Sequence, residues 1–278
     1  SDDLATSTVR LEVCRRSGTY SGTGFFVDFG GEDGLALVTN KHVVEGAIWI
    51  ELLVTVVAEG RENHVKVKLS HEDFHWLGHP ELEVDLCCLS GRYIREKIAS
   101  MGYASWCPRS IAENEILEQS DLEKYSPLDD LFMIGYPDAI HDIVNNQPIF
   151  RHGVFATIPN LDFNGMPEFL ADVSVFGGSS GSPVGVLDCG TSFCVERRTL
   201  SVTDKHHGNV RLAGVAYEAC IHMSKVEVKP ANSMDSAKEV GCESGVVRIP
   251  NHLAAVIKAY KILDFKDMVL SQNARKRP

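Results

Sequence analysis

The 278-residue sequence contains no long apolar run, no extended basic cluster and no cysteine pair of the CxxC type. No stretch approaches the roughly 18 apolar residues that a membrane-spanning helix needs, so we expect no membrane partner. The net charge is −11, from 27 Lys and Arg against 38 Asp and Glu, and the basic runs are short. Because a nucleic-acid-binding surface needs clustered Lys and Arg, we also expect no nucleic-acid partner.

The cysteines indicate neither a metal site nor a disulfide framework. Without a CxxC pair a zinc ribbon is not expected, and a chain of this length needs no disulfides. The sequence has no N-x-S/T glycosylation site and opens with the acidic Ser1-Asp2-Asp3, not with a signal peptide. We therefore expect a reducing, cytoplasmic setting. A disulfide between Cys189 and Cys194 stays open, and because residue 1 is not Met, so do a removed leader and a missing further domain.

Most periodic segments are short and resemble strands, with turn residues between them. About a dozen such segments predict an all-β sandwich or a pair of barrels. The expected strands are 8–13, 22–27, 35–39, 48–57, 65–69, 84–89, 131–135, 150–158, 169–175, 183–187, 211–217 and 246–249.

Two regions break this pattern. Residues 92–130 are charged and mixed, which predicts a connector between two halves. Near the end, apolar residues recur at helical spacing after Pro250, so we expect one amphipathic helix over about 250–264. The polar stretches 192–210 and 222–244 are expected to be long loops.

The stretch "VFGGSSGSPV" at 175–184 places serines among glycines. A serine hydroxyl becomes a nucleophile when an imidazole takes its proton and a carboxylate orients that imidazole. Glycines beside it let backbone N–H groups approach the developing oxyanion. His42, in "LVTNKHVV", follows an apolar strand, and Asp85, in "EVDLCCL", opens another. A buried Asp needs a partner, which a histidine N–H supplies.

The order His42, Asp85, Ser180, together with "GTGFFV", "LVTNKHVV", "VDLCCL" and "GGSSGSPV", resembles the chymotrypsin-fold serine peptidases. Within them it resembles the trypsin-like, HtrA/Deg-like branch, without a PDZ domain. The resemblance runs from about residue 7 to about 263, and 92–130, 192–210 and 222–244 are poorly covered. It implies two six-stranded antiparallel β-barrels of the chymotrypsin type with a C-terminal α-helix, in one domain over 1–278. The expected parts are an N-terminal barrel over about 7–92, a connector over 93–130, a C-terminal barrel over 131–249 and the helix over 250–264.

The same resemblance implies a role for each site residue. In the family pattern G-x-S-G-x-P the nucleophile falls on Ser180, with His42 as base and Asp85 behind it. The oxyanion donors would be the N–H groups of Gly178 and Ser180, with help from Ser179. Family members activated by proteolysis carry an acid at the position of Ser179, so we expect no trypsinogen-like switch in this chain.

The specificity pocket is also placed by resemblance. Its base falls near Ser174, with Val175 beside it, and its wall and peptide-pairing edge fall on Tyr217, Glu218 and Ala219. Because no acid stands at the base, we expect small or medium apolar P1 residues. The alternative, in which Asp172 or Glu218 binds a basic side chain, stays open.

One competing site comes from "HEDFHWLGH", where His71, His75 and His79 are spaced by four and would share a helix face able to bind zinc. The Gly78 and Pro80 beside them favour a strand or loop, so we expect no metal and no cofactor.

The sequence therefore predicts a serine endopeptidase that acts on polypeptides. Two alternatives remain. The first is a protease effector of a larger system, such as bacterial defence, switched on by an activating protein partner. The second is a catalytically silent peptide-binding module of the same fold.

Overall fold

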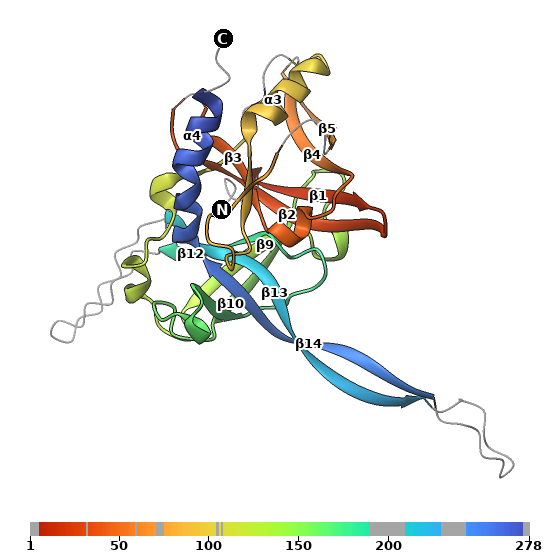
Figure 1. Cartoon of the computed structure of the whole chain (residues 1–278), viewed down its shortest axis with the longest axis vertical. Coiled ribbons are helices and arrows are strands. Elements are labelled where there is room, and N and C mark those ends of the chain that lie inside the picture. The colour runs from red at the N-terminus through yellow and green to blue at the C-terminus, as the bar shows by residue number, and fades with distance from the viewer. Residues whose placement is uncertain are drawn as a thin grey trace, which may run out of the picture.

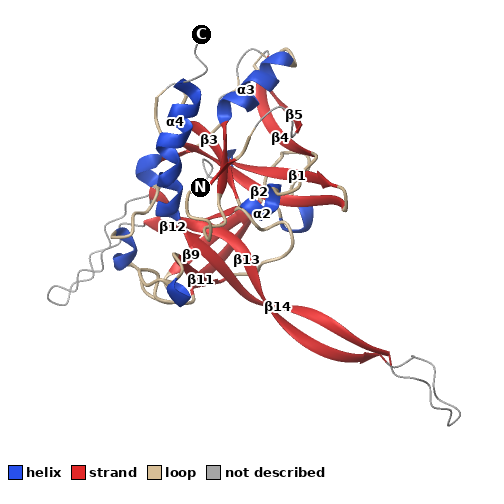
Figure 2. Cartoon of the chain, viewed as in Figure 1, coloured by secondary structure: helices blue, strands red, loops and turns tan. Residues whose placement is uncertain are grey.

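The computed structural model describes residues 6–31, 33–58, 60–70, 75–103, 106, 108–188, 209–228 and 243–274. Its strands form two units, one built from the N-terminal half and one from the C-terminal half of the chain (Figure 1). Helices are few and short and lie around the strands (Figure 2). Cys189, Cys194 and His71 lie outside the described residues.

The N-terminal unit, which we call the first sheet, has eight strands in the order β5-β4-β1-β2-β3-β7-β6, with β8 parallel to β2. From Val65 to Leu69, β5 buries every second residue, as a sheet with one covered face does. Within the described residues the sheet does not close on itself, and it has two strands more than the resemblance implied. Its strands are β1 (Thr8–Arg15), β2 (Gly18–Asp28), β3 (Leu35–Thr39), β4 (Trp49–Ala58), β5 (Arg61–Ser70), β6 (Leu77–Gly78), β7 (Cys87–Ser90) and β8 (Ile111–Ala112).

The C-terminal unit, the second barrel, is a closed antiparallel barrel in the order β10-β11-β14-β13-β12-β9. The all-β, chymotrypsin-type fold class expected from the sequence is thus confirmed. The barrel strands are β9 (Asp130–Gly135), β10 (Ile149–Phe155), β11 (Glu168–Asp172), β12 (Ser182–Asp188), β13 (Asn209–Val228) and β14 (Glu243–Lys258).

Between the two units runs the expected connector. It contains α3 (Gly91–Ser100), η1 (Glu113–Glu115) and η2 (Asp121–Lys124). The connector is tied to the second barrel, because the Leu117 N–H donates to the Leu212 carbonyl (2.9 Å). Short turns η3 (Pro137–Ala139) and η4 (Phe163–Gly165) join barrel strands.

The helix expected over 250–264 was wrong in position. Residues 250–258 continue β14, and the helical end of the chain is η5 (Ala259–Phe265) followed by α4 (Lys266–Ala274). Residues 254–259 are all buried, so this strand is covered on both faces. A short run of buried apolar residues such as alanine and valine occurs both in buried strands and in helices, so composition does not distinguish the two. Here pairing with neighbouring barrel strands makes the run a strand. No helix in the described part of the chain is long and apolar enough to cross a bilayer.

The loop expected over 222–244 was also wrong at its two ends. Residues 221–228 of β13 pair with residues 243–250 of β14, and together they form a two-stranded ribbon. This ribbon, which we call the arm, projects away from the first sheet and from the second barrel (Figure 1).

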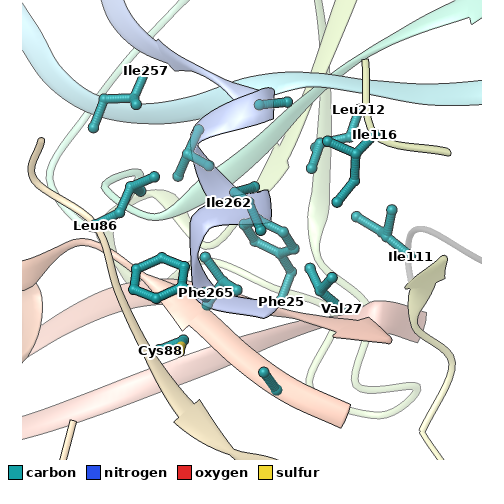
Figure 3. Close-up of a cluster of buried hydrophobic side chains, with 14 of the residues drawn as sticks. Phe25, Val27, Leu86, Cys88, Ile111, Ile116, Leu212, Ile257, Ile262 and Phe265 are labelled. Atoms are coloured by element: carbon teal, nitrogen blue, oxygen red, sulfur yellow. The ribbon is translucent and has the colours of Figure 1, made fainter. Parts of the chain in front are cut away.

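We call η5 and α4 together, residues 259–274, the C-terminal segment. The two units share one hydrophobic core with this segment (Figure 3). Phe25 of β2 and Leu86 before β7 pack there with Ile257 of β14. Ile262 and Phe265 of η5 lie in the middle of this cluster and are fully buried. The C-terminal segment therefore fills the space between the two units.

Candidate active site

His42 and Asp85 lie in direct contact. β3 ends at Thr39, and the single helical turn α2 (Lys41–Val44) then presents His42. The His42 Nδ1–H donates to Asp85 Oδ2 (2.5 Å), and the His42 backbone N–H donates to Asp85 Oδ1 (3.1 Å). This double contact fixes the imidazole tautomer with the proton on Nδ1, which leaves Nε2 as an acceptor. The imidazole is 45% exposed, so a substrate can reach it.

Neighbouring backbone contacts hold this pair in place. The buried Asn40 donates from Nδ2 to the Asp85 carbonyl (2.8 Å). Arg15, at the end of β1, donates from Nη2 to the carbonyls of His42 (2.5 Å) and Val43 (3.0 Å). The sequence analysis placed neither residue in the site, although Asn40 stands inside the quoted "LVTNKHVV" motif.

The loop that carries Asp85 is fixed from the C-terminal segment. The His79 side chain is fully buried, and its Nε2–H points to Asp264 Oδ2 (3.0 Å) and to the Lys261 carbonyl (3.1 Å). Its Nδ1 accepts from the Glu81 N–H (3.1 Å). This arrangement gives His79 a structural role. No group of three potential metal ligands gathers in the described part of the chain.

Ser180 lies on a tight turn that connects to β12. The turn contains Gly178 and Gly181, each at φ +85°, a conformation that favours glycine. A Cβ at Gly181 would stand 1.9 Å from the Thr23 carbonyl oxygen, so only glycine fits. The Ser180 carbonyl accepts from the Thr23 N–H (2.9 Å), which docks the turn onto β2 of the first sheet.

Thr23 also links this turn to the strand leading to His42. Its hydroxyl donates to the Gly178 carbonyl (2.9 Å), and its carbonyl accepts from the Thr39 hydroxyl (2.7 Å). Thr39 stands three residues before His42. The first sheet therefore brings the Ser180 turn, docked at the middle of β2, close to the end of β3 that leads to His42.

The Ser180 hydroxyl is not bonded to His42 in this structure. It donates to the Tyr217 carbonyl (3.1 Å), and within the described residues the His42 Nε2 has no hydrogen-bond partner. The imidazole acceptor is therefore open, whereas the serine hydroxyl must leave the Tyr217 carbonyl before it can donate to His42.

Two backbone donors beside Ser180 are open. The Gly177 carbonyl accepts from the Asp138 N–H (2.5 Å). Since C=O and N–H of a trans peptide point in opposite directions, this contact turns the Gly178 N–H away from Asp138. Among the described residues the N–H groups of Gly178 and Ser180 have no acceptor, whereas the Ser179 N–H donates to the Phe176 carbonyl (3.1 Å). Of the three expected oxyanion residues, two therefore have a free donor.

The expected pocket residues border the same region. Val175 is buried, and the Ser174 hydroxyl lies 3.3 Å from His252 Nδ1. Tyr217 sits at a register shift in β13, where Ala216 and Glu218 pair with consecutive residues of β14. Its phenol donates to the buried Glu168 Oε2 (2.5 Å), and burial together with this bond raises the pKa of Tyr217. The pair fixes the Tyr217 backbone whose carbonyl holds the Ser180 hydroxyl.

Comparison with known proteins points to one family. A family model described as "Trypsin-like peptidase domain" matches residues 22–188, which is 167 of the 278 residues. No curated protein matches the sequence. Two structures of the HtrA-type protease AlgW with a tripeptide, one of them a variant, superpose with TM-scores of 0.52 and 0.51 at 14% and 13% identity. Each match covers 98% of this chain and 62% of AlgW, so the chain spans less than two thirds of that protein. At such identity the likeness concerns the fold.

Proposed function

This chain belongs to the trypsin-like peptidase family, and we propose that it hydrolyses peptide bonds with Ser180 as nucleophile, His42 as general base and Asp85 as the group that orients His42. The observation that carries the proposal is the His42–Asp85 contact, with the Ser180 turn docked on the same first-sheet strands through Thr23. The exposure of the imidazole supports access by a polypeptide substrate.

The reaction would follow from these groups. Rotation of the Ser180 side chain moves its hydroxyl from the Tyr217 carbonyl toward His42 Nε2, which takes the proton as the oxygen attacks the peptide carbonyl. The N–H groups of Gly178 and Ser180 stabilise the oxyanion, and one such donor contributes about 10²–10³ in rate. Protonated His42 then gives its proton to the leaving amine, and water hydrolyses the acyl-enzyme by the reverse sequence of proton transfers.

For the pocket we propose a preference for small or medium apolar P1 residues. Ser174 and Val175 bring no carboxylate to the expected base, which speaks against a pocket built for Arg or Lys.

For activation we propose that no trypsinogen-like switch is needed, in which a newly made N-terminal ammonium orders the turn before the nucleophile. The Ser179 hydroxyl accepts from the Phe176 N–H (3.4 Å), and this bond within the turn supports the proposal.

A fluorophosphonate probe tests the nucleophile directly. We expect covalent labelling of the wild type and none of Ser180→Ala. Ser182→Ala is the matched control, because the Ser182 hydroxyl is buried without a hydrogen-bond partner and its loss should leave labelling intact. Labelling of Ser180→Ala, or loss of labelling in Ser182→Ala alone, would contradict the assignment.

A second candidate is a protease that an activating protein switches on. The bond from Ser180 to the Tyr217 carbonyl favours this reading, since it holds the nucleophile away from His42 at rest. Labelling that rises on addition of a partner would support it. A silent peptide-binding module would bind peptides and stay unlabelled with or without a partner.

A further inference from the structure

A small aromatic pocket lies beside the turn that carries His42. Its volume is about 250 Å³, and none of the residues expected to bind substrate lines it. Three segments of the N-terminal half do, namely the end of α2, the start of β4 and the two residues before β6. We call it the tryptophan pocket. Its lining includes Val44, Glu45, Ala47, Trp49, His75 and Trp76.

The tryptophan pocket has the size and the surface of a site for one side chain. Its volume lies below the roughly 300–1,000 Å³ of sites that enclose drug-sized ligands. Its floor is apolar, because Ile50 is buried and Val44 and Ala47 pack against the hydrophobic cluster of the first sheet. Trp49 and Trp76 border it with aromatic surface. A long side chain with an apolar stem therefore fits it.

A carboxylate without a partner lines the same pocket. Glu45 is exposed, and among the described residues its side chain makes no hydrogen bond and no ion pair. Its backbone N–H donates to the Lys41 carbonyl (2.9 Å), which fixes Glu45 at the end of α2, three residues after His42. An exposed carboxylate beside aromatic rings attracts a cation in two ways, by its charge and by the negative ring faces.

The Trp49 ring already binds a cation within the chain. The Lys68 ammonium, from the neighbouring strand β5, lies 4.0 Å from the centroid of the Trp49 ring. Lys68 is exposed and does not line the pocket. Trp49 remains partly exposed and borders the pocket with Lys68 in place. Since tryptophan is the aromatic side chain that binds cations best, this contact indicates the ligand chemistry that suits the pocket.

We propose that the tryptophan pocket binds a lysine or arginine side chain of a protein partner. The apolar stem of that side chain lies on the floor of the pocket, and its charged end meets the aromatic rings and Glu45. The net charge of −11 favours the approach of a basic partner. A partner bound here contacts the turn that carries His42 and, at residues 75–76, the segment that leads through β6 to Asp85.

Blocked amino acids test the site by NMR titration of the full chain at pH 8, where an ordinary histidine carries no charge. The ligand is N-acetyl-arginine amide, and the comparison is N-acetyl-citrulline amide, which has the same shape without the charge. The reporters are the indole N–H signals, assigned by replacing each tryptophan with phenylalanine. We expect the signals of Trp49 and Trp76 to move and that of Trp106, which is 5% exposed and outside the pocket, to stay. The arginine compound should bind about fivefold more tightly than the citrulline compound.

Two variants separate the two attractions. Glu45→Gln removes the charge and should weaken binding of the arginine compound about threefold while leaving the citrulline compound unaffected. Trp49→Leu keeps an apolar wall without the ring face and should also reduce the preference for arginine. Glu123→Gln is the matched control, because it removes the same charge at an exposed residue of η2 outside the pocket, and it should change neither affinity.

Equal affinity for the two compounds, or a preference for arginine that survives both Glu45→Gln and Trp49→Leu, would overturn the proposal. Tighter binding of free L-arginine than of its blocked form would assign the pocket to a metabolite and overturn the protein partner. The titration measures binding alone, so either result leaves the labelling of Ser180, and with it the proposed hydrolytic function, to be judged separately.

Discussion

A single threonine in β2 makes four of the contacts around the candidate site. The Thr23 N–H and hydroxyl donate to the carbonyls of Ser180 and Gly178, and its carbonyl accepts from Thr39. Its hydroxyl oxygen also accepts from the Tyr136 N–H (3.1 Å). The residue is fully buried, so each of these bonds lies where water does not compete for it.

We expect Thr23→Val to lower kcat by about 10- to 100-fold, because the turn that aims the Gly178 and Ser180 N–H groups loses a fixed contact. The Gly178 carbonyl and the Tyr136 N–H would be left unpaired, at a cost of about 1–3 kcal/mol in unfolding free energy. Kinetics on a short peptide measures kcat, and urea denaturation measures the unfolding free energy. Thr23→Ser keeps the hydroxyl and should restore kcat; equal loss in both variants would show that only packing matters.

At the scale of elements, the C-terminal segment holds the loop that carries Asp85 in place. Its residues Lys261 and Asp264 hold His79, which begins that loop. The His79 ring also packs edge-on against Phe265 (centroids 5.5 Å apart). Lys261 adds a more exposed ion pair to Glu81 (2.7 Å).

We predict that His79→Leu destabilises the fold by about 2–4 kcal/mol, since the Glu81 N–H loses its acceptor inside the protein. The loosened loop should reduce kcat more than it changes KM, because Asp85 orients His42 during proton transfer and not during binding. Lys261→Met is the matched control: it removes the ion pair with the exposed Glu81 and the contact of the ammonium with the Tyr260 ring (5.3 Å), but it keeps the Lys261 carbonyl that holds His79. A stability loss with an unchanged kcat would mean that the loop does not position Asp85.

The connector is anchored by charge. Asp121 of η2 accepts from Arg211 of β13 (2.8 Å) and from Lys124 (2.6 Å). Hydrogen bonds from Arg211 and then Lys124 hold the pKa of Asp121 well below its ordinary value. A carboxyl whose pKa is lowered in the folded state stabilises that state above its unfolded pKa and loses this contribution as the pH falls.

Asp121→Asn should therefore be about 1–3 kcal/mol less stable than the wild type near neutral pH. The difference should shrink as the pH falls below about 4, the ordinary range of the Asp pKa, because the unfolded chain then takes up a proton that the folded carboxyl, with its lowered pKa, does not bind. Urea denaturation between pH 7 and pH 3.5 measures the trend. A difference that stays constant over this range would show that the charge of Asp121 contributes nothing.

At the scale of the whole molecule, the sequence predicted what depends on local pattern. The fold class was predicted from the alternating strands. The candidate site residues were predicted from the glycines around Ser180 and from the order of the motifs. Features set by distant partners were not predictable. The structural role of His79 was not predicted: the sequence offered this residue only as a disfavoured zinc ligand, because its partner, Asp264, lies 185 residues away. The first strand of the arm, 221–228, was expected to lie in a loop because the stretch 222–244 is polar and interrupted, and its strand structure depends on pairing with residues 243–250.

The shared core predicts that the two units unfold together. Phe265 is fully buried in a cluster that takes residues from the first sheet, the second barrel and the C-terminal segment. The three tryptophans, Trp49, Trp76 and Trp106, all lie in the N-terminal half, so their fluorescence reports on that half alone. Far-UV circular dichroism reports on the strands of both.

In urea we expect the fluorescence and circular dichroism transitions to coincide, as they do when one cooperative unit unfolds. Phe265→Ala should lower the unfolding free energy by about 3–5 kcal/mol and move both transitions by the same amount, because the cavity it leaves weakens both units. Val57→Ala, at a residue that is 59% exposed on β4, is the control and should move neither. Separate midpoints, or a shift of circular dichroism without fluorescence, would mean that each unit folds on its own and that the site between them depends on docking.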